Sequence, residues 1–167
     1  MSKEIELVDL VDASGQIKKK AIPRSEAEQH PNLHLQIVIA AIFDYAGQLL
    51  VQRRALTKST CPGDIDLVCG AVVSGETPEK AAIRESLEET GIEPKNLKVV
   101  QSGVNSYSRF RYLLIGEADG ESNSYDPVEV EWVKFMSPDE LRAKNQSGEL
   151  TFVGEFFEDM ELAIDGK

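Results

Sequence analysis

The chain has few of the residues that several common protein classes need. Its two cysteines, Cys61 and Cys69, offer neither a disulfide framework nor a zinc-ligand spacing. No apolar run reaches the roughly 18 residues of a membrane helix, and the start MSKEIELVDLVD lacks the basic and then apolar layout of a signal peptide. We therefore expect a cytoplasmic protein with reduced thiols and no membrane partner.

Positive charge is also scarce. Lysine and arginine number 18 against 29 aspartates and glutamates, which gives a formal net charge of −11 at pH 7. Duplex nucleic acid is bound mainly through lysines and arginines that neutralise phosphates, so this balance disfavours a duplex partner. A small phosphorylated substrate remains compatible, because it needs only a local cation site to which a bound metal ion contributes.

The chain length and a hydrophobic content of 41% predict a single domain over residues 1–167, with residues 1–24 as an N-terminal β extension. Residues 24–33 and 54–64 are predicted to be loops. Alternating or apolar runs predict strands at residues 5–12, 16–23, 34–43, 48–53, 65–73, 97–104, 109–118 and 128–135. Helices are predicted at residues 78–90, 138–145 and 152–164. This order predicts an α/β fold with a mixed sheet packed between helices.

The most informative segment runs from residue 70 to residue 92, GAVVSGETPEKAAIRESLEETGI. Thr77 can cap the start of a helix, Pro78 suits the first helical position, and Gly91 can end the helix in a left-handed conformation. The segment therefore predicts a loop followed by one well-delimited helix.

Three glutamates, Glu85, Glu88 and Glu89, share one face of this helix at about 100° per residue. Carboxylates at these spacings repel one another by about 0.2–0.5 kcal/mol per pair unless something neutralises them. A hard divalent cation would remove that repulsion, and ligands that are all oxygen suit Mg²⁺ or Mn²⁺. The spacing therefore predicts a metal site along this edge of the helix.

The whole segment resembles the signature of the Nudix hydrolases. The positions that carry the resemblance are Gly70, Glu76, Arg84, Glu85, Glu88, Glu89, Gly91 and Ile92. The resemblance implies a Nudix-like α/β/α sandwich with a mixed β-sheet between helices. It also implies metal-dependent hydrolysis of a diphosphate linkage in a nucleoside diphosphate linked to another group, such as a nucleotide or a sugar.

One residue departs from the family pattern. Ser86 stands in the middle of the apolar helix face, where the family usually has an aliphatic residue. We expect a local packing compromise, in which the hydroxyl returns to the carbonyl of Ala82 and stability suffers more than function.

The resemblance also assigns roles within the segment. It makes Glu85 and Glu89 the direct metal ligands and Glu88 a ligand or a water-positioning group, joined by the main-chain carbonyl of Cys69. The number of bound metals stays open.

Other residues are expected to support these ligands. Glu76 and Arg84 are predicted to form an ion pair that fixes the loop onto the helix and orients the ligands, with Gly70 supporting the site from the preceding strand.

The general base that activates water could come from either of two parts of the chain. Relatives take this base either from the helix, where Glu85 is the candidate, or from an acid on a later loop. Asp126 is the best-placed acid of that second kind, with Glu129 and Glu131 as further candidates on the following strand.

Substrate binding needs cations and aromatic surfaces. The cationic candidates for the phosphates are Arg53, Arg54, Lys58, Arg109 and Arg111. The aromatic candidates for stacking a base are Tyr107, Phe110, Tyr112 and Tyr125. The nucleoside and the leaving group are not specified by these residues, and residues 4–23 are expected to serve a possible homodimer.

Two rival functions remain. The stretch before the helix resembles the isopentenyl-diphosphate isomerase branch of the same family, because Cys69 stands just before Gly70, where the isomerases carry a reactive cysteine. However, Ala71 stands where the isomerases have a metal-binding histidine, and only His34 resembles a second isomerase histidine. The strand RFRYLLIG, which should carry the isomerase glutamates, has no acidic residue before Glu117. The intact glutamates of the helix also favour hydrolysis. The second rival is a Nudix domain that senses a nucleotide without cleaving it, which would not need the complete acid set.

Overall fold

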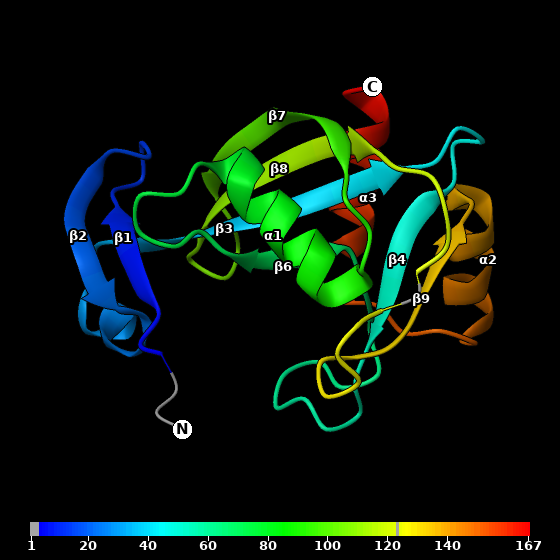
Figure 1. Cartoon of the computed structure of the whole chain (residues 1–167), viewed down its shortest axis with the longest axis horizontal. Coiled ribbons are helices and arrows are strands. Elements are labelled where there is room, and N and C mark those ends of the chain that lie inside the picture. Colours follow the sequence, from blue (N-terminus) through cyan, green and yellow to red (C-terminus); the bar gives the residue numbers. More distant parts are fainter. Residues whose placement is uncertain (1–3, 123) are drawn as a thin grey trace.

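The computed structural model describes residues 4–122 and 124–167, and a mixed nine-stranded sheet runs through this part of the chain (Figure 1). Strand β3 (His34–Phe43) lies at its centre. It pairs in parallel with β8 (Phe110–Glu117) and antiparallel with β1 (Leu7–Val11), β4 (Leu49–Arg54) and β6 (Val68–Ala71). A strand with neighbours on both edges must satisfy its backbone within the sheet, and β-branched residues suit that position.

The apolar run of β3 reflects burial on both faces of the sheet. Alternate side chains of a strand point to opposite faces. Val38, Ala40 and Ile42 pack with buried alanines of helix α1 (Pro78–Thr90), whereas Ile39, Ala41 and Phe43 pack with Phe156 and Met160 of helix α3 (Phe156–Asp165). The predicted α/β/α sandwich is therefore confirmed, with α1 on one face and α3 on the other.

The remaining elements extend this sheet and its helical layers. Strand β7 pairs with β8, both β9 and β5 pair with β4, and β2 pairs with β1 as an exposed edge strand. Their bounds are Ile17–Pro23 (β2), Ile65–Asp66 (β5), Lys95–Val104 (β7), Val130–Met136 (β9) and Pro138–Ser147 (α2). The β1–β2 hairpin stands at one end of the molecule, beside the N-terminal end of β3 (Figure 1).

Three predicted elements differ from the structure. The single strand predicted over residues 65–73 is two short strands, β5 and β6, which pair with β4 and β3 respectively. Residues 24–29, expected to be a loop, form a short 3₁₀ helix. The last helix begins at Phe156 rather than at residue 152, because Ile65 donates to the Thr151 carbonyl (2.8 Å) and Val153 donates to the Ile65 carbonyl (3.1 Å). These bonds hold the segment before α3 extended alongside β5. None of the described helices is both long and apolar enough to cross a bilayer.

The end of α1 corrects the expectation for Ser86. Its side chain is fully buried, and its hydroxyl donates forward to the Ile92 carbonyl (2.7 Å) instead of back to Ala82. Thr90 joins this polar cluster, because its hydroxyl donates to the Ser86 carbonyl (2.6 Å) and accepts from the Ile92 N–H (3.2 Å). Ser86 therefore closes the turn after the helix and contributes to stability.

Replacing Ser86 with alanine should lower the free energy of unfolding by about 1–3 kcal/mol, because a buried carbonyl loses its donor. Urea denaturation measures this change. Leu87→Ala on the same helix is the control, since Leu87 is 44% exposed and its truncation should stay within about 0.5 kcal/mol of the wild type. Equal stability of Ser86→Ala and the wild type would contradict the role given to the hydroxyl.

Candidate active site

Helix α1 begins and ends where its capping residues predict. The Thr77 hydroxyl accepts from the Lys80 N–H (3.3 Å), Pro78 is the first helical residue, and Gly91 ends the helix with φ of 69°. These caps set the phase of the helix, so the side chains of Glu85 and Glu89 come to lie beside strand β6.

The predicted ion pair between Arg84 and Glu76 is present. Arg84 Nε and Nη2 donate to the two carboxylate oxygens of Glu76, and both donor–acceptor distances are 3.0 Å. Nη2 also donates to the Ala71 carbonyl on β6 (2.9 Å). Glu76 in turn accepts from the Val73 N–H (3.1 Å). Donation of these hydrogen bonds to Glu76 raises the pKa of Arg84 above its ordinary value. This network fixes both the loop and strand β6 onto α1.

Gly70 makes room for Glu85. A β-carbon at residue 70 would lie 2.0 Å from Glu85 Cδ, which no side chain can tolerate without moving the carboxylate. Arg84 Nη1 donates to the same carboxylate (2.6 Å). Glu85 is therefore held between the strand and the neighbouring arginine.

Glu89 is held by the strands next to α1. One of its oxygens, Oε2, accepts from the Cys69 N–H (3.1 Å) and from the side-chain amide of Gln52 on β4 (2.7 Å). Gln52 is itself 2% exposed, and its amide also donates to the Leu67 carbonyl. Among the residues that the structure describes, these donors all engage Oε2, so Oε1 has no protein donor.

The carboxylates of Glu85, Glu89 and Asp66 lie close together and are largely shielded from water. Burial raises the pKa of Glu89 well above its ordinary value, and the nearby charges of Asp66 and Glu85 raise it further. Burial likewise raises the pKa of Glu85, and it raises the pKa of Asp66 to about 6 despite the charge of Arg54. Grouped acids of this kind are stabilised in their charged form by a nearby cation.

The oxygen donors of Glu85 and Glu89 fit a hard divalent cation, because magnesium needs only one or two carboxylates when water and substrate phosphates supply its other ligands. Glu88 is placed differently, and its role as a ligand or a water-positioning group stays a prediction. It lies on the outer side of α1 with its side chain 60% exposed, 3.7 Å from Arg84 Nη1. Across residues 4–122 and 124–167, no three acidic, histidine or cysteine side chains already converge as a metal cluster.

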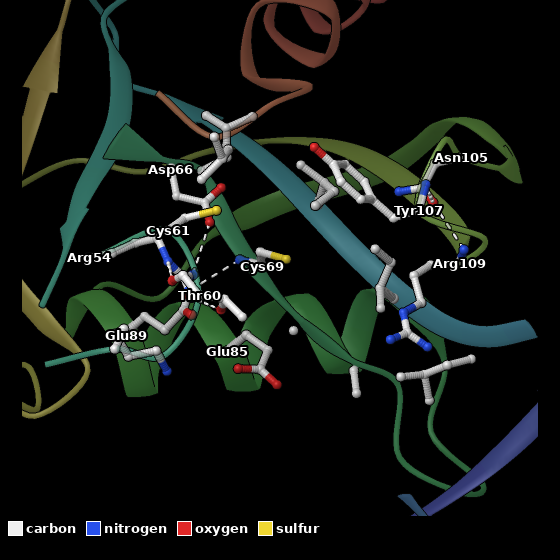
Figure 2. Close-up of a pocket in the computed structure, with 18 of the residues that line it drawn as sticks. Arg54, Thr60, Cys61, Asp66, Cys69, Glu85, Glu89, Asn105, Tyr107 and Arg109 are labelled. Carbon is white, nitrogen blue, oxygen red and sulfur yellow. Dashed lines mark hydrogen bonds and ion pairs between the residues drawn. The ribbon is translucent and has the colours of Figure 1, made fainter. Parts of the chain in front are cut away.

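A cavity of about 1040 Å³ opens beside these carboxylates (Figure 2). Glu85 and Glu89 reach it from α1, and Tyr107 and Arg109 lie at its opposite side. Small-molecule sites typically occupy about 300–1,000 Å³. The cavity is thus large enough for more than a diphosphate group.

Three of the predicted substrate cations line this cavity, namely Arg109 on the side opposite the glutamates, Arg54 and Lys58. Arg54 is paired with Asp66 (3.2 Å) and donates to the carbonyl and the hydroxyl of Thr60. Lys58 is paired with Glu129, which also lines the cavity. Glu129 is therefore the loop acid that the structure brings to the site.

Three other predicted site residues lie elsewhere. Arg111 does not line the cavity but is 7% exposed and paired with Asp159, whose pKa burial raises to about 7. Arg53 is paired with Glu131 (3.2 Å), which gives both a partner away from the cavity lining. Asp126 is exposed, and its carboxylate accepts from the Val128 N–H (2.9 Å). Arg111 thus belongs to a buried ion pair, Arg53 to an ion pair between neighbouring strands, and Asp126 to a turn.

The sequence patterns did not indicate Gln52, Asp66, Asn105 or Glu155, although all four contact or line the site. Asp66 carried a detectable signal, because it is a charged residue between the apolar residues Ile65 and Leu67. Gln52 carried none, since it stands beside Arg53 and Arg54 in a strand with a polar end. Asn105 and Glu155 lie in loops, where polar residues are ordinary, so their role appears only through their contact with each other (3.1 Å).

The sandwich and its glutamate-lined cavity define a Nudix-type domain. The family model described as NUDIX domain matches residues 33–156. An isopentenyl-diphosphate Delta-isomerase of Streptomyces coelicolor is 31% identical, with 83% of this chain and 75% of the relative covered. An uncharacterized Nudix hydrolase of Listeria innocua is 31% identical, with 89% of each chain covered. The chain therefore belongs to the Nudix hydrolase family.

A solved structure supports the same conclusion. The crystal structure of DR0079 from Deinococcus radiodurans superposes with a TM-score of 0.70 at 28% identity, covering 90% of this chain and 94% of that one. The two chains thus share one fold over nearly their whole length, including the segments on both sides of α1.

The contact between Gly70 and Glu85 generates a prediction. Gly70→Ala should reduce diphosphate hydrolysis and divalent-cation affinity by about tenfold or more, because its β-carbon would displace the carboxylate of Glu85, which is predicted to bind the cation. Isothermal titration with Mn²⁺ and a phosphate-release assay measure the two effects.

Gly75→Ala is the matched control for this substitution. Its backbone φ of 81° strains any side chain, but a β-carbon there meets nothing within 4 Å. It should therefore lose some stability and keep both cation binding and activity. Unchanged Mn²⁺ affinity in folded Gly70→Ala would show that Glu85 is not positioned by this contact.

Proposed function

We propose that the protein is a hydrolase that depends on Mg²⁺ or Mn²⁺ and cleaves a diphosphate linkage in a nucleoside diphosphate joined to another group. The observation that carries this proposal is the placement of Glu85 and Glu89, two partly buried carboxylates, at one side of a cavity that extends well beyond them. A diphosphate can approach these oxygens through a shared cation while the rest of the substrate occupies the remaining volume.

Glu85 and Glu89 would hold the cation, with the Cys69 carbonyl as the further ligand that the family resemblance implies. A cation bound there would polarise phosphate oxygens and lower the pKa of a water molecule. Arg84, Glu76 and Gly70 keep the two carboxylates in place and touch no reacting atom in this mechanism. Lys58 and Arg54 contribute positive charge at the cavity wall, where phosphate oxygens would lie.

In the proposed reaction, a water oxygen bonds to one phosphorus, the bridging P–O bond breaks, and two phosphate-containing products leave. The water proton passes to a carboxylate. Glu85 and Glu129 line the cavity and are the two candidates for this general base, whereas Asp126 and Glu131 do not line it.

The isomerase is the second candidate function, because the Streptomyces coelicolor relative carries that name and Cys69 lines the cavity. Burial raises the pKa of the Cys69 thiol well above its ordinary value, and the charges of Asp66 and Glu89 raise it further. The hydrolase is favoured by other residues, because Ala71 stands where the isomerases carry a metal-binding histidine and Glu85, Glu88 and Glu89 are all present.

Substitutions at Cys69 and Glu89 separate the two functions. With Mg²⁺ and a panel of nucleoside di- and triphosphates, nucleotide sugars, ADP-ribose and dinucleotides, phosphorus NMR should detect hydrolysis by the wild type. Cys69→Ala should keep this activity within about threefold, whereas Glu89→Gln should lower it by about a hundredfold or more through loss of a ligand charge. Chelation with EDTA should stop turnover reversibly.

The opposite pattern would favour the rival. The isomerase would replace the hydrolase if the wild type converted isopentenyl diphosphate, Cys69→Ala abolished that conversion, and the wild type hydrolysed none of the nucleotide compounds. Absence of turnover with every compound, together with tight nucleotide binding, would favour a sensing domain.

We also propose that the protein forms a homodimer through residues 4–23. Strand β2 is an edge strand whose residues 17–21 are exposed, and it offers unpaired backbone groups to a second copy. Sedimentation at several protein concentrations would test it.

A further inference from the structure

The cavity continues past the glutamates over an apolar floor. Leu35, Ile37 and Ile39 line it from alternate positions of β3, and Leu67 and Ala71 line it beside them. Residues at alternate positions share one face of a strand, so the three β3 side chains form a continuous stripe. A diphosphate gains nothing from such a surface, whereas an uncharged group attached to the diphosphate does.

Tyr107 is the aromatic candidate that the structure brings to this part of the cavity. The other three have different partners. Phe110 is 4% exposed and packs edge-on against Tyr112, whose hydroxyl donates to Gln36, while Tyr125 donates to the Glu131 carbonyl. Tyr107 itself is 60% exposed. An exposed aromatic side chain at a cavity wall has a free ring surface to offer to a ligand.

The turn that carries Tyr107 is held in one conformation. The Asn105 side-chain oxygen accepts from the backbone N–H groups of Tyr107 (3.1 Å) and Arg109 (3.0 Å). The Asn105 amide then donates to Glu155 at the start of α3 (3.1 Å), and Ser106 donates to the same carboxylate through its N–H (3.1 Å) and its hydroxyl (2.6 Å). Glu155 therefore fastens the β7–β8 turn to the opposite segment.

The hydroxyl end of the Tyr107 ring lies against Gly154. A β-carbon on Gly154 would lie 2.0 Å from the Tyr107 hydroxyl oxygen, so the phenol occupies the space that a side chain at residue 154 would need. The ring is thus placed by its turn at one end and by Gly154 at the other. An aromatic group positioned before binding contributes contact area without losing further conformational freedom.

We propose that Tyr107 determines substrate specificity by stacking on a flat ring, such as a nucleobase, that lies over the β3 stripe of Leu35, Ile37 and Ile39. This inference rests on the proposed function and names the part of the substrate beyond the diphosphate. Arg109 lines the same cavity and is paired with Glu28 (3.7 Å), which lines it too. The glutamates of α1 and the turn of Tyr107 then contact opposite ends of one ligand.

Binding and kinetics test this assignment with Mg²⁺ present. Calorimetry compares ADP, which carries a base, with isopentenyl diphosphate and inorganic pyrophosphate, which do not. Tyr107→Ala should weaken ADP binding by about tenfold or more, as loss of a stacked base does, and leave pyrophosphate binding unchanged. The KM of the best nucleotide substrate should rise by a similar factor, with kcat changed less than about twofold.

Three further variants separate the ring from the fold. Tyr107→Phe keeps the ring and should stay within about twofold of the wild type for ADP. Gly154→Ala displaces the ring and should behave like Tyr107→Ala, with folding checked by circular dichroism. Tyr45→Ala is the matched control, because Tyr45 is 94% exposed in the β3–β4 turn and does not line the cavity.

Several outcomes would overturn the inference while the hydrolase stands. These are ADP binding that Tyr107→Ala leaves unchanged, an equal loss for isopentenyl diphosphate and ADP, or wild-type protein that hydrolyses diphosphates without binding ADP. Failure of the hydrolase itself has another signature, namely ADP binding that depends on Tyr107 but no turnover with the whole panel.

Discussion

The hydrogen bonds of Arg84 determine where the chemistry of this protein can occur. By engaging Glu76 on the loop and the Ala71 carbonyl on β6, one guanidinium joins three consecutive pieces of chain that would otherwise be free to separate. Only with α1 fastened in this way does Glu85 lie against Gly70. The planar, bidentate geometry of arginine suits this task, which a lysine could not perform with one ammonium group.

Local signals in the sequence were enough to predict α1, its caps and the position of β3. Thr77, Pro78 and Gly91 act on the backbone next to them, so no distant contact changes their effect. The α/β/α layers followed because an apolar strand such as β3 requires cover on both faces. The sequence also indicated which helix edge carries the acids.

Contacts between distant segments could not be predicted in the same way. The sequence could not show that α3 brings Asp159 beside Arg111, or that the Asp126 carboxylate accepts from the Val128 N–H. Glu88 shares a face with its neighbours on a helical wheel, but strand β6 covers only the part of that face where Glu85 and Glu89 lie. Tertiary packing therefore divides a uniform acidic edge into an inner and an outer part.

The two segments that line the ends of the cavity belong to different parts of the chain. Within the part of the chain that the structure describes, they share no hydrogen-bonded network. Arg84 and Gly70 organise one end, whereas Glu155 organises the other through the turn at residues 105–109. Mutations in that turn can accumulate during evolution without disturbing the helix. A chain built on this plan can change the far end of its cavity while Glu85 and Glu89 keep their positions beside β6.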